Sequence, residues 1–464
     1  MIRLFRVFVP VGPLALLSSE ILLIASSFIL AAFLVLNVDP TVYLLYDGGL
    51  VRILLVLASI LLGMHFQDLY SKIYVRSRLV LAQQLCLVIG IAFLSQALIG
   101  YLDADLRLLP IGVMMLGSLL AVIVMFAWRL FFSAYVLRIV AQDRLLLVGA
   151  SPLLEDIAGH IEEFPETGLQ VVGYVDDRAE IGTAMAGGTV LGPVASLREI
   201  VQATMPDRIV VGMTERRARM PVRELLELRF AGHVIEEAAS TYEKVCGRVC
   251  LKELRPSQLI YSGELGPRRA SMFYQTAINV VVAAIGVVVA MPIMLLTALA
   301  VRLTSAGPVL YRQVRVGLNG RPFTLYKFRS MRADAEAETG AVWASKDDPR
   351  VTPFGRIIRK LRIDEIPQLF NVLKGEMSMV GPRPERPEMV QSLSEKIPYY
   401  GHRHCVRPGI TGWAQVNYKY GDTLEDVIRK LEYDLYYIKN MSLSLDSYII
   451  FLTIKATLLS RGSQ

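Results

Sequence analysis

Cysteine and charge are both scarce in this chain of 464 residues. Its four cysteines, Cys86, Cys246, Cys250 and Cys405, are too few and too scattered for a disulfide scaffold, which is typical of a reducing compartment or a membrane. Cys246 and Cys250 have no nearby Cys or His pair to complete four zinc ligands, so we expect no zinc site.

Charged residues make up 20% of the chain against 53% hydrophobic ones, which excludes a disordered chain and favours lipid-facing segments. The net charge of +7 suits a protein that lies against anionic lipid or handles phosphates. Nucleic-acid binding is not expected, because it would need a concentrated basic patch that the sequence lacks.

Four stretches in the first third of the chain contain no Asp, Glu, Lys or Arg. They are Ile21–Val38, Ile53–Met64, Leu79–Leu102 and Leu108–Trp128. With its flanks, each is long enough to cross roughly 30 Å of hydrocarbon. We therefore predict a membrane α-helical bundle of four spans within residues 1–140, kept as an anchor and not removed as a signal peptide. The segments after the second and fourth stretches are basic, whereas those after the first and third are acidic. Because basic loops stay on the cytoplasmic side, both ends of the bundle are expected there.

Residues 141–255 alternate short β-branched runs with helical ones, which predicts an α/β Rossmann-like module with a parallel sheet. Its first turn lacks the dinucleotide fingerprint, because Ser151 and Leu154 replace the second and third glycines. Asp176 and Asp177 stand where a ribose-binding acid often sits, although loop acids there are usually solvated. Nucleotide binding and a regulatory or dimerising scaffold both remain open, and the scaffold is favoured.

A third region starts near Arg268 with Ala270–Val301, a stretch without charge that contains Pro292. It is long enough to be a simple span. Both of its flanks are basic, however, and the sequence that follows is polar. A helix that enters the membrane, breaks at Pro292 and returns to the same face fits this pattern better, so we predict a reentrant hairpin.

The most informative pair of acids is Asp364–Glu365. Neighbouring acids alone usually mark only a solvated helix start. Here Arg356, Arg359, Lys360 and Arg362 crowd just upstream, which indicates an anionic ligand held together with a divalent cation. Adjacent helical residues point about 100° apart, so one carboxylate can attack while the other holds the metal. The alternative for the basic residues is contact with lipid headgroups.

Several other motifs offer cations in rigid settings. Arg383 stands between two prolines and Arg407 precedes a Pro-Gly pair, which suits phosphate recognition, although bare turns are the alternative. Lys327 and Arg329 lie in the run Tyr326–Met331 and are further candidates for phosphate contacts. Trp413 could stack on a base or fill the core, and the core is favoured.

These motifs together make the sequence from Arg268 to the end resemble the bacterial sugar transferase family of monotopic phosphoglycosyl transferases. The matching segments are Tyr326–Met331, Asp364–Asn371, Gly381–Pro384 and Pro408–Asn417. The resemblance implies a mainly α-helical catalytic domain, residues 268–464, with a membrane helix hinged at Pro292. It also implies that Asp364 is a nucleophile, Glu365 a Mg²⁺ ligand and Arg359 a supporting phosphate contact. Many members carry Ser before the hinge proline, where this chain has Met291.

The family resemblance implies transfer of a sugar 1-phosphate from a UDP-sugar to polyprenyl (undecaprenyl) phosphate, with release of UMP. Such reactions start exopolysaccharide or glycoconjugate synthesis at the cytoplasmic face of the bacterial inner membrane, and a homodimer is our guess from the family. Large-form members similar to undecaprenyl-phosphate glucose or galactose phosphotransferases share this domain order.

Two rival classes of function have weaker support. A membrane-tethered nucleotide-sugar dehydratase or epimerase would need the glycine fingerprint and a Tyr-x3-Lys couple, and no tyrosine here has lysine four residues later. A non-enzymatic scaffold or a transporter is the other class. A translocation path would need buried ionisable residues, and the four predicted spans contain none.

Overall fold

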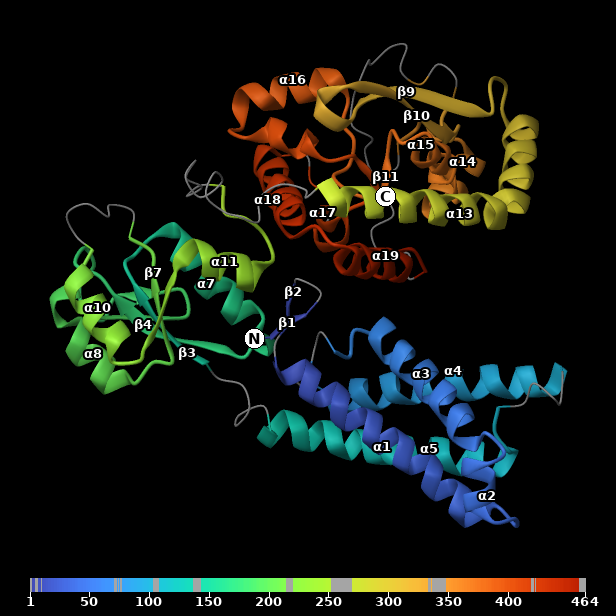
Figure 1. Cartoon of the computed structure of the whole chain (residues 1–464), viewed down its shortest axis with the longest axis horizontal. Coiled ribbons are helices and arrows are strands. Elements are labelled where there is room, and N and C mark those ends of the chain that lie inside the picture. Colours follow the sequence, from blue (N-terminus) through green and yellow to red (C-terminus); the bar gives the residue numbers. More distant parts are fainter. Residues whose placement is uncertain are drawn as a thin grey trace. The chain divides into compact units, whose positions relative to one another are not determined.

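The computed structural model of the chain forms two compact units (Figure 1). Residues up to Ala238 form the first unit, except Leu4–Val7, which group with the residues from Ala239 onward in the second. The structure describes residues 2–4, 7–9, 11–70, 73, 75, 77–102, 108–136, 143–213, 220–251, 269–332, 335, 348–418, 421 and 423–458. The predicted domain limits at 140, 141, 255 and 268 lie outside these residues. So do half of the ten charged residues that gave the predicted topology, namely Lys72, Arg76, Asp103, Asp105 and Arg138.

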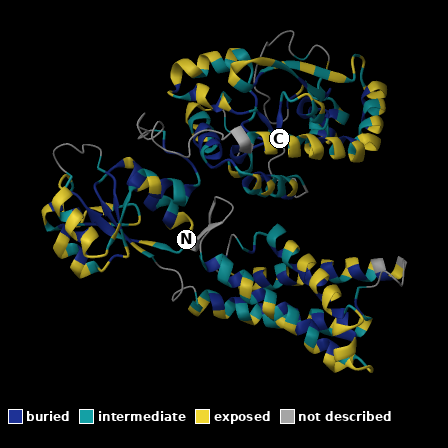
Figure 2. Cartoon of the chain, viewed as in Figure 1, coloured by how far each residue is buried: buried dark blue, intermediate teal, exposed yellow. Residues whose placement is uncertain are grey.

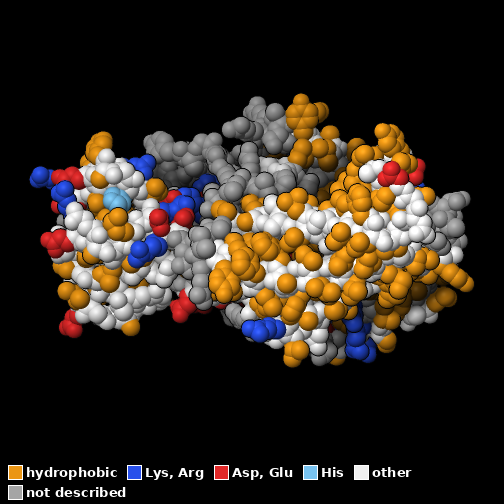
Figure 3. Space-filling view, turned by 90° about the horizontal axis from the view of Figure 1, so that it is seen from below, with side chains coloured by type: hydrophobic (Ala, Val, Ile, Leu, Met, Phe, Trp, Pro, Cys, Tyr) orange, Lys and Arg blue, Asp and Glu red, His pale blue; other side chains and the backbone are white. Residues whose placement is uncertain are grey.

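Apolar helices fill the start of the first unit. They are α1 (Val11–Val35), α2 (Pro40–Leu45), α3 (Gly49–Phe66), α4 (Arg78–Leu102) and α5 (Ile111–Phe131), with β1 (Ile2–Leu4) and β2 (Val7–Val9) ahead of them. Their inner faces form a core around Phe28, Ile60 and Met125. Their outer faces expose many large apolar side chains. The exposed residues are coloured yellow on the ribbon in Figure 2, and hydrophobic side chains gather in orange in Figure 3. Such a surface is unfavourable in water and suits lipid, so the prediction of several apolar N-terminal helices in a membrane protein is confirmed.

A buried ion pair lies inside this bundle. Glu20 of α1 is 0% exposed and Arg129 of α5 is 3% exposed. Arg129 donates to both carboxylate oxygens of Glu20, at 2.7 and 3.2 Å, and to the carbonyl oxygen of Leu69 at 2.9 Å. The expectation that these helices contain no ionisable residues is therefore wrong. The predicted stretches were ended at charged residues, whereas the helices continue through them because the two charges neutralise each other.

A mixed sheet of six strands completes the first unit, in the order β5 (Ala184–Met185), β6 (Gly188–Gly192), β4 (Leu169–Val175), β3 (Asp143–Val148), β7 (Arg208–Val211) and β8 (Val234–Glu237). All neighbours are parallel except β5 and β6. The helices α7 (Pro152–Glu163), α8 (Leu197–Thr204) and α10 (Val222–Phe230) connect the strands. This alternation of strands and helices is the one that the hydrophobic pattern predicts.

Side chains of the protein itself accept hydrogen bonds from the backbone N–H groups of the turn between β3 and α7. Ser151 caps α7, since its hydroxyl oxygen accepts from the Leu154 N–H. Asp176, at the end of β4, accepts from the Ala150 N–H at 3.1 Å and from the Arg178 N–H at 2.9 Å. The acid predicted for ribose binding or for solvent therefore serves the protein's own backbone.

The second unit is mostly helical. It contains α11 (Ala238–Cys246), α13 (Arg269–Thr304), α14 (Pro353–Lys360), α15 (Gln368–Leu373), α16 (Pro387–Lys396), α17 (Trp413–Asn417), α18 (Leu424–Asn440) and α19 (Leu443–Leu458). Two small sheets join them: β9 (Leu310–Val316) pairs antiparallel with β10 (Pro322–Phe328), and β11 (Ser378–Val380) pairs parallel with β12 (Gly409–Thr411). Trp413 is buried in the core with Tyr436, and its indole N–H donates to the Gly247 carbonyl at 2.8 Å. Its predicted core role is confirmed.

The long helix α13 carries Pro292 in its interior and is drawn with a sharp bend in Figure 1. Its first part contacts the unit through Asn279, whose side-chain amide donates to the Ser378 hydroxyl at 2.7 Å. Its last part packs Val301 against Phe328 and Ile358. Both ends of this apolar helix therefore contact the same globular unit.

Candidate active site

The predicted acid pair follows a short helix, α14, whose start is fixed by local sequence. Thr352 caps α14, because its hydroxyl oxygen accepts from the Gly355 N–H at 2.9 Å. Glycine is required at position 355, since a Cβ atom there would lie 1.9 Å from the carbonyl oxygen of Ser330. The run that ends at Met331 and the helix before the acid pair are thus packed directly on each other.

Arg362 turns the chain from α14 into the acid pair. Its backbone is left-handed, with φ 58° and ψ 18°. A non-glycine residue in this region costs on the order of 1–2 kcal/mol, and such strain often lies at functional sites. The turn leads into η5 (Ile363–Glu365), a single 3₁₀ turn that places Asp364 with only 8% of its surface exposed.

Three cations surround Glu365. The Lys327 ammonium lies 2.9 Å from Oε1, an Arg383 nitrogen lies 3.3 Å from the same oxygen, and an Arg362 nitrogen lies 3.7 Å from Oε2. The three come from β10, from the segment after β11 and from the left-handed turn. Four predicted site residues, Asp364 included, thus come together from separate parts of the sequence.

The two neighbouring acids differ in protonation. Burial raises the pKa of Asp364 to about 6, and the negative charge of Glu365 acts in the same direction. The positive charges of Lys327, Arg359 and Arg362 oppose this rise. Burial acts on Glu365 too, but Lys327 and two arginines hold the pKa of Glu365 well below its usual range. Glu365 is therefore ionised across the physiological pH range, whereas Asp364 gains or loses its proton near its pKa of about 6.

Arg383 lies on the irregular segment Gly381–Glu385, which we call the strap. The strap leaves β11, and the Gly381 N–H donates to the carbonyl oxygen of Thr411 in β12 at 2.9 Å. A Cβ atom on Gly381 would lie 2.4 Å from the carbonyl oxygen of Arg407. The two Pro- and Gly-containing motifs therefore pack backbone to backbone, and this close contact directs the strap toward Glu365.

A buried amide fixes the strand that carries Lys327. The Asn371 side chain on α15 accepts from the Tyr326 N–H at 3.1 Å and donates to the Thr324 carbonyl oxygen at 2.7 Å. It also donates to Glu376 at 2.7 Å. Because these bonds bracket β10, Asn371 holds Lys327 in register with the acid pair.

Two predicted phosphate contacts, Arg329 and Arg407, lie at the junction with α13. Arg329, only 6% exposed, donates to the carbonyl and hydroxyl oxygens of Ser305 just after the helix, at 2.8 and 2.7 Å. Arg407 donates to the hydroxyl of Thr276 in the first part of α13, at 2.6 Å. Their hydrogen bonds thus join the globular unit to the apolar helix and leave the cluster around Glu365 to other cations.

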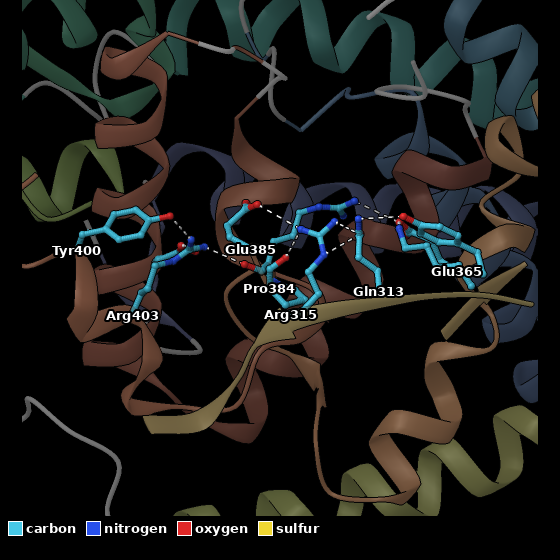
Figure 4. Close-up of polar contacts among 11 residues, drawn as sticks. Gln313, Arg315, Glu365, Pro384, Glu385, Tyr400 and Arg403 are labelled. Carbon is cyan, nitrogen blue, oxygen red and sulfur yellow. Dashed lines mark hydrogen bonds and ion pairs between the residues drawn. The ribbon is translucent and has the colours of Figure 1, made fainter. Parts of the chain in front are cut away.

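A polar row next to the cluster was missed by sequence reasoning (Figure 4). Arg315 of β9 donates to Gln313 at 3.0 and 2.6 Å and to the Pro384 carbonyl oxygen at 3.1 Å. Arg403 donates to Tyr400 at 2.8 Å and to the carbonyl oxygen of Arg383 at 3.0 Å. A period-two pattern of polar residues along β9 is the only local signal for this row.

A divalent cation fits this donor set in part. Mg²⁺ is usually bound by one or two carboxylates plus substrate phosphates, and Asp364–Glu365 supplies two carboxylates. Oε2 of Glu365 has Arg362 only at 3.7 Å, beyond hydrogen-bond distance, which leaves lone pairs for a metal. Within the described residues no group of three or more His, Cys, Asp and Glu side chains is placed to bind a metal. A metal here would therefore depend on the substrate's phosphates.

Comparison with known proteins gives two family matches. The model described as bacterial sugar transferase matches residues 270–460, and the model described as CoA-binding domain matches residues 65–227. The first match contains the acid pair, its surrounding cations and α13 from its second residue onward.

Three relatives illustrate the likeness. The chain is 46% identical to a UDP-N-acetylgalactosamine-undecaprenyl-phosphate N-acetylgalactosaminephosphotransferase of Aeromonas hydrophila, over 48% of this chain and 52% of that protein. It is 34% identical to a UDP-glucose:undecaprenyl-phosphate glucose-1-phosphate transferase of Xanthomonas campestris pv. campestris, over 67% of this chain and 66% of the relative. It is 46% identical to the uncharacterized sugar transferase EpsL of Bacillus subtilis, over 37% of this chain and 81% of that protein.

These matches place the chain in a class of membrane-associated transferases. The chain belongs to the bacterial sugar transferase family. It spans about half to two thirds of the length of the Aeromonas and Xanthomonas relatives.

Proposed function

We propose that this protein transfers a sugar 1-phosphate from a UDP-sugar to undecaprenyl phosphate and releases UMP, as the initiating step of exopolysaccharide or glycoconjugate synthesis. The observation that carries the proposal is Asp364, a buried carboxyl with a raised pKa, directly before Glu365, whose carboxylate is surrounded by three cations. The family and the names of the relatives support the substrate class. A tethered dehydratase or a non-enzymatic scaffold has no comparable support.

Asp364 is the proposed nucleophile. Its carboxylate oxygen attacks the phosphorus that bears the sugar, the bond from this phosphorus to the bridging oxygen breaks, and UMP leaves with the electron pair. The acyl phosphosugar is then attacked by a phosphate oxygen of the lipid carrier, which returns Asp364 as a carboxylate. Dividing the transfer in this way means that the site never holds both bulky substrates at once.

The surrounding cations are proposed phosphate contacts. Lys327 and Arg383 reach Glu365 and stand closest to the diphosphate of a donor at Asp364, with Arg359 adding positive charge from α14. We keep the phosphate roles of Arg329 and Arg407 as proposals. They are supported by the Nε of each, which has no hydrogen-bond partner among the described residues.

Glu365 is the proposed Mg²⁺ ligand, through Oε2. A bound divalent ion would offset the repulsion between the donor's phosphates and an attacking carboxylate. Glu365→Gln should therefore lower activity strongly and raise the magnesium requirement. Full activity in excess EDTA would rule out this role.

We propose that α13 is a reentrant membrane helix hinged at Pro292, in a multi-pass protein of the bacterial inner membrane with its active site facing the cytoplasm. The support is that both ends of α13 contact the same globular unit. A straight span would separate its ends by roughly 30 Å of hydrocarbon. Labelling of cysteines placed near residues 269 and 315 from opposite sides of the membrane would contradict the hairpin.

For the rest of the chain we propose a four-span bundle in residues 1–140, a Rossmann-like module in residues 141–255 and the catalytic domain in residues 268–464, assembled as a homodimer. The strand order and parallel pairing support the Rossmann-like reading. We favour a scaffold role for this module, because Asp176 occupies the Ala150 N–H and Ser151 occupies the Leu154 N–H that a bound pyrophosphate would use. This arrangement fits poorly with the coenzyme that the second family match implies.

One experiment tests the proposed reaction. Purified protein in detergent or nanodiscs is given a panel of UDP-sugars with undecaprenyl phosphate and Mg²⁺, and UMP release is measured. With at least one UDP-sugar we expect UMP release that continues beyond one equivalent of enzyme, and we expect this continued release only when the lipid phosphate is present. No release above background with any donor would overturn the proposal.

A further inference from the structure

The strap is held by its carbonyl groups. Pro382 and Pro384 have no N–H, so the backbone on both sides of Arg383 has lost donors that could anchor it. The carbonyl oxygens take over this task. Pro382 accepts from the Gly409 N–H at 3.0 Å, and Glu385 accepts from the Val316 N–H at 2.9 Å.

The two carbonyl oxygens between these anchors are bound by arginine side chains. Arg403 donates to the carbonyl oxygen of Arg383 at 3.0 Å, and Arg315 donates to that of Pro384 at 3.1 Å. Four consecutive carbonyl groups of the strap are therefore bonded, two of them by charged donors. All four bonds have similar lengths, but hydrogen bonds from charged donors are stronger than neutral ones, so we expect these two to contribute most to the position of the residue between the prolines.

Both arginines are fixed by partners of their own. Arg403 is buried and forms an ion pair with Asp434 on α18 at 2.8 Å. Arg315 lies 3.5 Å from the Glu385 carboxylate and donates through two nitrogens to Gln313. Each planar guanidinium is thereby oriented before it reaches the strap, which a lysine ammonium could not achieve with the same geometry.

We propose that Arg315 and Arg403 are positioning residues for the reaction. They hold the strap so that the Arg383 guanidinium stays beside Glu365, where it meets the donor's diphosphate. The inference rests on the proposed function for the role of Arg383, but the holding of the strap is independent of it. The charged contacts of the two arginines are to the strap's carbonyl oxygens and to the carboxylates of Glu385 and Asp434, and not to the acid pair.

A double-mutant cycle tests the route through Arg383. R315K and R403K keep the positive charge but remove the planar guanidinium with its several N–H donors. Each should lower kcat/KM for the UDP-sugar roughly tenfold. In an R383A background, the same changes should cost less than about twofold, because the group that they position is gone. Equal losses in both backgrounds would mean that the arginines act on general stability, and would overturn the proposal.

A second measurement does not depend on activity. Hydrogen–deuterium exchange of the Val316 and Gly409 N–H groups, which donate to the strap's carbonyl oxygens, reports how firmly the strap is held, and we call it exchange of the strap. It should become faster in R315K and R403K, while exchange of α11 stays as in the wild type. The exposed Arg429, stacked 5.8 Å from the Tyr418 ring, provides the matched control, and R429K should leave exchange of the strap and of α11 unchanged. If R315K or R403K fails to fold, Q313M loosens Arg315 without removing a charge and should also speed exchange of the strap.

The two ways of failing are distinct. Unchanged exchange of the strap in all three variants overturns the positioning role even if UMP release proceeds as proposed. Faster exchange without UMP release from any donor leaves the strap's anchoring intact and removes the proposed function instead.

Discussion

Two buried charge clusters in this protein look alike in composition and differ in balance. In the bundle, one acid meets one base: Glu20 and Arg129 neutralise each other through two hydrogen bonds. In the second unit, Asp364 and Glu365 share their surroundings with three cations, and a left-handed Arg362 leads into them. Both carboxylate oxygens of Glu20 accept hydrogen bonds from Arg129, so the charge of this pair is already neutralised within the bundle. We infer from this difference that unbalanced charge, and not the burial of charge alone, marks the candidate active site.

The largest expected effect comes from Asp364→Asn. Removing the proposed nucleophile should reduce turnover by roughly 10³-fold or more. The same change should raise the thermal midpoint. The pKa of Asp364 is raised in the fold from 3.8 to about 6, so its favourable contribution exists in acid and is lost as pH rises through about 6. At pH 8 the neutral Asn avoids an ionisation cost on the order of 2–3 kcal/mol.

Thermal unfolding in detergent at pH 8 measures this prediction, with Asp156→Asn on the exposed face of α7 as the matched control. A midpoint for Asp364→Asn that falls below the wild type would show that the buried carboxylate stabilises the fold, as the bundle pair does.

The bundle pair should respond in the opposite way. Arg129→Met leaves Glu20 buried without its partner, which should cost about 3–5 kcal/mol, whereas turnover per folded molecule stays unchanged. Replacing both residues, by Glu20→Leu with Arg129→Met, should restore most of the stability. Thermal unfolding and UMP release normalised to folded protein measure the two quantities. A folded double variant without activity would mean that this pair takes part in function.

The pH dependence separates the clusters further. Protonated Asp364 cannot attack, so kcat/KM should fall about tenfold per unit below its pKa of about 6 and level off above it. Lys327 lowers the pKa of Asp364, so Lys327→Gln should move this acid limb to higher pH. The pH–rate profile of the wild type and of Lys327→Gln tests both statements. A limb that stays in place or moves toward acid in the variant would contradict the assigned charges.

The smallest effect is expected at an exposed pair. Arg223 and Glu227 lie one turn apart on α10, 3.3 Å from each other, with side chains 87% and 46% exposed. Glu227→Gln should change the free energy of unfolding by no more than about 0.5 kcal/mol, because water screens such pairs. Thermal unfolding alongside Arg129→Met gives the scale. If Glu227→Gln lost as much unfolding free energy as Arg129→Met, burial would not explain why one ion pair matters more than the other.

Sequence reasoning reached the parts of this protein that local patterns encode. Apolar runs predicted the helices. The alternation of short strands with helices predicted a parallel sheet, and the sheet is parallel except for its edge strand β5, which pairs antiparallel with β6. Lys327, Arg383 and the acid pair, all named from motifs, lie together. The predicted spans stop short of Glu20 and Arg129, because they were defined as stretches without charge. The sequence does not show that these two residues, 109 positions apart, form an ion pair inside the bundle.

The supports of the site were beyond reach for the same reason. Arg315 meets the Pro384 carbonyl across 69 residues of sequence, and Arg403 meets that of Arg383 across 20. The period-two pattern along β9 marks Arg315 as polar but does not reveal its partner, and Arg403 has no such pattern around it. Asp176 shows the converse limit, since the sequence places it at the end of a strand but does not reveal that the Ala150 N–H is its partner.

The central claim is that Asp364 forms a covalent bond to the sugar phosphate before the lipid carrier arrives. The most direct measurement mixes enzyme with UDP-sugar and Mg²⁺ in the absence of polyprenyl phosphate, and follows UMP release together with the intact mass of the protein. Our account predicts a burst of UMP that stops at about one equivalent of enzyme, a phosphosugar adduct on the wild type, and neither in Asp364→Asn. A wild type that releases no UMP until the lipid phosphate is added, and that never gains the adduct, would contradict it.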